Sequence, residues 1–213
     1  MKHVWSIAVT VLVAAVVLPL ALVAQEAKPK AAESQPAKEK PAASAAGTYK
    51  VDPVHSSNAF CIRHLGVTNF YGRFNETAGT FVLNDDDPAK DAFEITIKAT
   101  SIDTHNEARD KHLKSDAFFD VEKYPDITFK STAVKKEGAG VLVVTGDLTL
   151  HGTTKPITTT VMLIGAGPGM KGEFRAGFET TFTVKRSEYG VSGLPGALGE
   201  DVKITVSVEG MRE

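Results

Sequence analysis

Apolar and polar residues alternate along most of the chain from residue 48 onward. The segment 93–98 reads FEITIK, so its Phe and two Ile residues fall on one face, and its Glu, Thr and Lys fall on the other. The same alternation recurs in the segments 60–63, 142–150, 174–185 and 202–209. A period of two is that of a β-strand with one buried face. The pattern therefore predicts a β-rich domain in which nearly every strand has one apolar side.

Turn segments rich in Gly, Pro, Asn and Asp separate these strands, at 84–88, 137–140, 165–169 and 190–199. Short strands with regular turn signals are typical of an antiparallel meander. About eight strands with one apolar side can bury that side in a closed barrel or in a sandwich. A single helical insert favours the barrel. We therefore predict an all-β fold, a closed antiparallel β-barrel of about eight strands with a short helical insert.

The insert is the polar segment 100–132, which interrupts the alternation once. It is too long for a tight hairpin turn, and an insert of this size usually has structure or function of its own. Thr104, followed three residues later by Glu107, fits a capping box. This spacing predicts a short helix that starts near His105.

The first 47 residues differ in composition from the rest. Lys2 and His3 precede a charge-free apolar run from Val4 to Ala24, which predicts a signal peptide at 1–24 or, if uncleaved, a membrane anchor. Residues 25–47 are mostly Ala, Lys, Pro, Glu and Ser, which predicts a disordered linker. The remaining 48–213 has the size of one domain. We expect that domain to be periplasmic or secreted, and close to a membrane if residues 4–24 are retained.

Charge argues against one class of partner. The chain carries 24 basic and 26 acidic residues, and five of the bases and three of the acids precede Thr48. The domain from Thr48 onward thus has 19 bases against 23 acids, a formal charge of −4. A domain of this sign without a Lys/Arg stripe has no general attraction for nucleic acid. We expect no nucleic-acid partner.

The sequence offers no convincing catalytic residue. Cys61 is the only cysteine, so neither an intrachain disulfide nor a two-cysteine metal site can form. It sits mid-strand in AFCIRH, where most cysteines are structural. Ser192 lies in GVSGL, which lacks the final glycine of a nucleophile elbow.

Histidines leave one alternative function open. The domain contains five of them, His55, His64, His105, His112 and His151, and no pair has the HExxH spacing. We predict no metal site and no cofactor. A secreted hydrolase or metal-dependent enzyme that uses these histidines is the alternative.

Several motifs resemble the YceI-like family of exported, lipocalin-like proteins that bind polyisoprenoid lipids. They are YKVDPVHSS at 49–57, FCIRHLGV at 60–67, NEARDKHL at 106–113 and GDLTLHGTTKPI at 146–157. The resemblance covers nearly all of 48–213. It implies a lipocalin-like barrel, sealed at one end, around a long apolar cavity that takes an isoprenoid quinone, an isoprenyl phosphate or a similar lipid. It implies no established catalytic residue.

Phenylalanines dominate the face of the strands that is expected to point inward, as the wall of such a cavity requires. The expected lining residues are Phe60, Ile62, Phe93, Ile95, Phe129, Phe174, Phe178, Phe182 and Val206. A barrel filled by its own side chains, as in a structural protein, is the other interpretation. The expected function is non-enzymatic binding, transport or storage of an isoprenoid lipid or quinone. A homodimer is left open.

Three cationic or titratable side chains of the insert would share a face of its helix, namely His105, Arg109 and His112. One interpretation makes them a headgroup site at the cavity mouth, where Arg109 meets a phosphate or a quinone oxygen. The other is that Arg109 and Asp110 tie the insert to the barrel.

Overall fold

The computed structural model describes residues 44–213. The predicted signal peptide or anchor at 1–24 and the linker up to residue 43 lie outside the described residues. Residues 44–47, assigned to the linker from the sequence, are part of the folded domain. Ala45 packs against the core, and its carbonyl accepts a hydrogen bond from the Tyr49 hydroxyl at 2.7 Å. Within 44–213, no helix has both the length and the apolar character that a membrane crossing needs.

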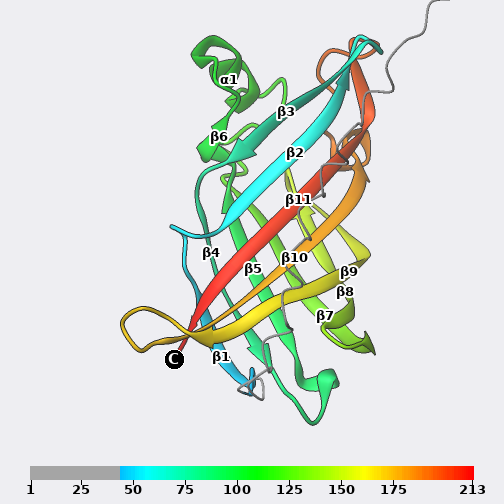
Figure 1. Ribbon diagram of the computed structural model, residues 1–213. Coiled ribbons are helices and arrows are strands. Elements are labelled where there is room, and N and C mark those ends of the chain that lie inside the picture. Colours follow the sequence, from blue (N-terminus) through cyan, green and yellow to red (C-terminus); the bar gives the residue numbers. More distant parts are fainter. Residues whose placement is uncertain (1–43) are drawn as a thin grey trace, which may run out of the picture. The chain divides into compact units, whose positions relative to one another are not determined.

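Strands dominate the described chain (Figure 1). In chain order they are β1 (Gly47–Val51), β2 (Ser57–His64), β3 (Thr68–Phe74), β4 (Thr77–Leu83), β5 (Ala92–Lys98), β6 (Ile102–Asp103), β7 (Asp126–Gly138), β8 (Val141–Leu150), β9 (Thr153–Pro168), β10 (Phe174–Lys185) and β11 (Leu198–Arg212). The α-helix of this region is α1 (Glu107–Lys114), and three short 3₁₀ turns are η1 (Pro88–Lys90), η2 (Ala99–Ser101) and η3 (Arg186–Tyr189).

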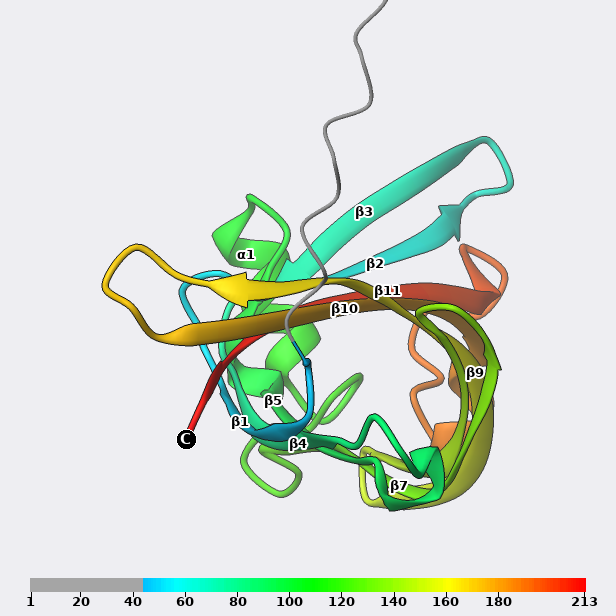
Figure 2. The ribbon, with the colours of Figure 1, turned by 60° about the horizontal axis from the view of Figure 1, so that its bottom comes forward.

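Eight of these strands close into a ring. Their order is β1-β4-β5-β7-β8-β9-β10-β11, and the pairing of β1 with β11 closes it. Every pairing in the ring is antiparallel. The ring is visible from the end where β1 lies (Figure 2). The predicted closed antiparallel barrel is confirmed.

On one of its sides, the last strand, β11, pairs with two different strands. The C-terminal end of β11 pairs with β1 at residues 210–212, and the rest of it pairs with β2 at residues 198–207. β2 continues into β3, and β3 pairs with β6. β2, β3 and β6 thus extend the sheet beyond the closed ring, on the side where α1 lies (Figure 1).

The helix of the insert starts later than the sequence predicted. α1 begins at Glu107, and its N-cap is Asn106, whose side-chain oxygen accepts a hydrogen bond from the Arg109 backbone N–H at 2.9 Å. The capping-box prediction for Thr104 is therefore wrong. The Thr104 hydroxyl cannot cap the helix because it is bonded to the side chains of Arg109 and Asp110.

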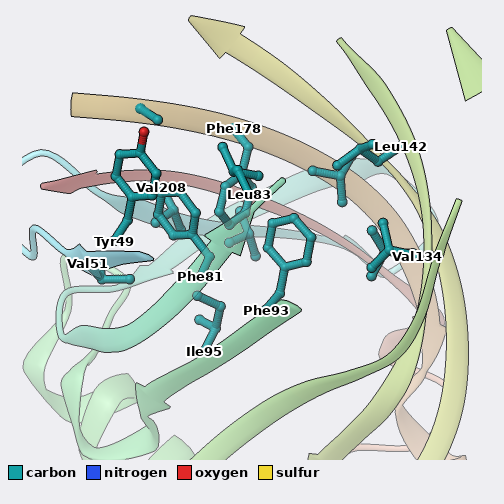
Figure 3. Packing of buried hydrophobic residues seen from close by; sticks show 14 of the residues in the cluster. Tyr49, Val51, Phe81, Leu83, Phe93, Ile95, Val134, Leu142, Phe178 and Val208 are labelled. Carbon is teal, nitrogen blue, oxygen red and sulfur yellow. The ribbon is translucent and has the colours of Figure 1, made fainter. Parts of the chain in front are cut away.

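One half of the barrel is solidly packed. Around the end where β1 closes the ring, aromatic rings stack on one another, with Tyr49 and Phe81 at 4.8 Å and nearly parallel. Phe178 meets both Phe81 and Phe93 edge-on, at 5.2 and 5.1 Å (Figure 3). Aliphatic side chains such as Val208 fill the space between them. This cluster seals one end of the barrel.

Candidate functional site

The other half of the barrel encloses an apolar cavity. Its volume is about 200 Å³. This is many times the volume that a single buried water needs. This half of the barrel is therefore hollow. The sequence alone had left open whether side chains fill the interior.

Phe93 and Phe178 form the floor of the cavity. Both belong to the packed cluster, where they are 2% and 3% exposed, and both also line the cavity. Their edge-on packing leaves no room for a chain to pass between them. The cavity therefore runs from this floor toward the end of the barrel that carries α1 and η3.

The structure brings together most of the apolar residues expected from the sequence. Those that line the cavity are Phe60, Ile62, Phe93, Ile95, Phe129, Phe178, Phe182 and Val206. Phe174 does not line it. Its ring packs against the sealed cluster and lies 3.8 Å beneath the guanidinium of Arg212. Contact of these residues with a ligand stays a prediction.

Arg109 holds the turn before α1 and also borders the cavity. Its Nε donates to the Thr104 hydroxyl at 2.7 Å and its Nη2 donates to the Thr104 carbonyl at 2.6 Å. Its guanidinium also lies 4.5 Å from the centre of the Phe70 ring and borders the cavity. Asp110 accepts the Thr104 N–H at 3.0 Å, which fixes the same turn. Arg109 thus fixes the turn that precedes α1, packs on Phe70 of β3 and borders the cavity. Its contact with a ligand headgroup stays a prediction.

The two histidines of the insert do not line the cavity with Arg109. The His105 side chain is 81% exposed and lies before the helix, near Asp103. His112 is also exposed, and its ring packs edge-on against Phe118, which itself lines the cavity. His105, Arg109 and His112, which the sequence grouped on one face, therefore do not form one site: of the three, only Arg109 lines the cavity.

Arg186 is a cavity residue that the sequence did not reveal. It is 4% exposed, and its guanidinium donates to the carbonyls of Gly199 at 2.9 Å, Val191 at 3.0 Å and Gly193 at 2.7 Å. These bonds hold the loop between η3 and β11, which contributes Val191 to the cavity wall. A single arginine at the end of a strand carries no signal of such a role.

The neutral polar residues of the cavity were also missed. They are Asn58, Thr128, Thr159 and Thr180. Asn58 shares the inward face of β2 with Phe60 and Ile62, so the alternation itself places it there.

One cluster of metal-type ligands lies elsewhere on the domain. Among residues 44–213 it consists of Asp52, His55 and Glu209. The Arg175 guanidinium contacts both carboxylates, at 2.8 Å from Asp52, so a cation already bridges them. Hydrogen bonds from His55 and then from Arg175 hold the pKa of the Asp52 carboxyl well below its usual range. The cluster is an ion-pair network that joins strands.

Comparison with known proteins agrees with this geometry. A family model described as the YceI-like domain matches residues 49–210. The chain belongs to the YceI-like family. The match runs from Tyr49 in β1 to Gly210 near the end of β11. The resemblance drawn from the motifs is therefore confirmed.

Relatives of this YceI-like protein include curated and structurally solved members. Protein YceI of Escherichia coli is 42% identical over 173 residues, which is 80% of this chain and 90% of the relative. The crystal structure of a YceI protein from Campylobacter jejuni is 31% identical with a TM-score of 0.62, and the match covers 71% of this chain and 90% of that one.

A more distant structure shares the fold. It is a polyisoprenoid binding domain from Saccharophagus degradans, with a TM-score of 0.62 and 15% identity over 78% of this chain and 98% of that chain. At this identity the likeness shows the barrel architecture.

Proposed function

We propose that this YceI-like protein binds a long-chain isoprenoid lipid, an isoprenoid quinone or a polyprenyl phosphate, in the barrel cavity. The observation that carries the proposal is the apolar cavity of about 200 Å³ above a floor of packed aromatic rings. Burial of an apolar chain there is favoured by about 25 cal/mol per Å². The entropic costs of association are subtracted from this gain.

The family and its relatives support the same class of ligand. The Saccharophagus degradans domain with the same fold is a polyisoprenoid binding domain. An isoprenoid chain is long, branched and apolar, and the walls offer phenylalanine, isoleucine and valine side chains along their length. Arg109, at the α1 end, would meet a phosphate or quinone oxygen at the outer end of such a ligand.

The protein acts in this proposal as a carrier or store and catalyses no reaction. Within 44–213, the residues that line the cavity include no His, Cys, Ser, Asp or Glu. Their polar groups are amide, hydroxyl and guanidinium, which bind and orient but are poor general bases at neutral pH. The apolar run at 4–24 supports a site of action outside the cytoplasm, periplasmic or secreted.

The proposal is tested by mass spectrometry of lipid extracted from the full-length protein after purification from a bacterial host that makes isoprenoid quinones. We expect one isoprenoid-type lipid in near-stoichiometric amount, and uptake of added ubiquinone or menaquinone by protein stripped of lipid. Protein without co-purifying lipid that also takes up neither quinone would refute the proposal.

A further inference from the structure

One polar side chain on the cavity wall has no hydrogen-bond partner among the residues that the structure describes. Asn58 is 3% exposed, and neither its amide nitrogen nor its amide oxygen has a hydrogen-bond partner among residues 44–213. Buried side-chain amides in folded proteins are nearly always paired. Asn58 lines the cavity together with Phe60 and Ile62 of the same strand, so its side chain faces the interior.

The neighbours of Asn58 cannot satisfy it. It pairs in register with Val206 on β11 and with Phe74 on β3, and both side chains are apolar. The next inward residue across the sheet is Thr180, which pairs with Val206. The Thr180 hydroxyl lies 2.8 Å from the carbonyl of Thr160, to which it donates, and 2.6 Å from the Thr159 hydroxyl. These threonines are therefore bonded to each other and to the backbone.

Asn58 lies close to the floor of the cavity. Its partner Val206 is followed on the same face of β11 by Val208, which pairs with the floor residue Phe178. The charged residues of the lining, Arg109 and Arg186, come from α1 and from η3. A polar group that reaches Asn58 therefore lies at the inner end of the cavity, away from both cations.

Resting on the proposed function, we propose that Asn58 binds an uncharged group at the inner end of the bound chain. That group both donates and accepts hydrogen bonds, and an alcohol hydroxyl is the simplest case. The Asn58 amide offers two N–H donors and a carbonyl acceptor, so a hydroxyl satisfies both of its ends. A phosphate does not suit this place, because burial of a charge without a countercharge is strongly unfavourable. An isoprenoid quinone or polyprenyl phosphate with its head at Arg109 brings only hydrocarbon to Asn58. The ligand inferred from Asn58 is therefore an isoprenoid that carries a second, uncharged polar group at the opposite end of the chain.

The test compares two probes that differ only at this end, farnesol and farnesyl methyl ether. The ether oxygen accepts a hydrogen bond but donates none. Displacement of an apolar fluorescent dye from the full-length protein gives a Kd for each probe. We expect the wild-type protein to bind farnesol about tenfold more tightly, the size of one net hydrogen bond. The Asn58→Leu variant should lose this preference and bind farnesol no more tightly than the ether, because the buried hydroxyl then has no partner.

Stability and a matched variant complete the test. Asn58→Leu should raise the melting temperature of the unliganded protein, because it removes an unpaired buried amide. Thr128→Val removes a polar group from another strand of the wall at nearly constant volume and should keep the preference for farnesol. If Asn58→Leu does not fold, Asn58→Ala gives the same comparison of probes.

The outcomes separate this inference from the proposed function. Equal affinity of the wild-type protein for both probes would overturn the role of Asn58 and leave chain binding intact. An equal loss of preference in Thr128→Val would also overturn it. If neither probe nor a quinone bound, the proposed function itself would fail.

Discussion

Phe178 belongs to two parts of the barrel at once. Its ring packs edge-on against Phe81 and Phe93 in the sealed cluster, and its other side borders the cavity. Phe81 is 1% exposed and lies in the cluster, away from the cavity lining. Of these two phenylalanines in contact, only Phe178 lines the barrel cavity.

This difference predicts opposite responses to added volume. In Phe178→Trp the extra ring atoms can extend into the cavity, so we expect little change in the free energy of unfolding but a marked loss of affinity for a long-chain ligand. Urea unfolding and dye displacement measure the two effects.

The matched control is Phe81→Trp. The Phe81 ring is 1% exposed and is not part of the lining of the barrel cavity, so overpacking should destabilise the protein by about 1–3 kcal/mol. Equal destabilisation by the two substitutions would mean that the space beside Phe178 is not accessible to a side chain.

At the level of elements, a charged network joins the β1–β2 turn to β10 and β11. Asp52 accepts hydrogen bonds from the Val54 backbone N–H at 2.9 Å, from His55 at 2.8 Å and from Arg175 on β10 at 2.8 Å. Glu209 on β11 contacts the same guanidinium. The network fixes the place where β11 changes partner from β2 to β1.

This network predicts a loss of stability in acid. The folded protein holds the pKa of Asp52 below its value in the unfolded chain, chiefly through the bond from His55 and then through Arg175. The stabilisation is thus fully present above the unfolded pKa, near 3.9. It is lost as the pH falls from there through the folded pKa.

Asp52→Asn isolates this contribution, because the amide oxygen can still accept the Val54 N–H but carries no charge. We expect the variant to be less stable than the wild type at pH 7, with the difference narrowing below about pH 4. Urea unfolding at several pH values measures both. A difference that does not change with pH would exclude the charge of Asp52 as its cause.

On the scale of the whole molecule, the packed core and the cavity lie in different halves of the barrel. The sealed half contains the stacked rings of Tyr49 and Phe81 with fully buried aliphatic residues such as Val144. The hollow half is lined by partly buried residues such as Phe182. Each residue that lines a cavity lacks van der Waals contacts on the side that faces it, so it contributes less to stability than a fully packed residue.

Truncation should therefore cost more in the sealed half. Phe81→Ala should destabilise the protein by about 3–5 kcal/mol, because it creates a new void in a packed region. Phe182→Ala should cost less, because it only enlarges an existing cavity, and it should weaken binding of a long-chain ligand. Chemical denaturation gives both free energies, and similar losses would contradict the division of the barrel into two halves.

Much of the architecture could be predicted because alternation reports burial directly. Phe60 and Ile62 line the cavity as their period of two predicted, since successive side chains of a strand point to opposite faces. Phe174 shows the limit of this reasoning. Its register is inward, but its level along the barrel belongs to the sealed end. The alternation of a strand predicts which face of the sheet a residue occupies, but not the position of that residue along the barrel axis.

The sequence by itself determined the class of fold, the family and the apolar character of the inner wall, because these depend on local periodicity and on contiguous motifs. Only the tertiary structure decided that one half of the barrel is packed and the other hollow. It also showed that Arg186 holds a loop and that Asn58 stands unpaired near the floor. These features depend on which strands become neighbours and at what register, and residues far apart in the chain set both.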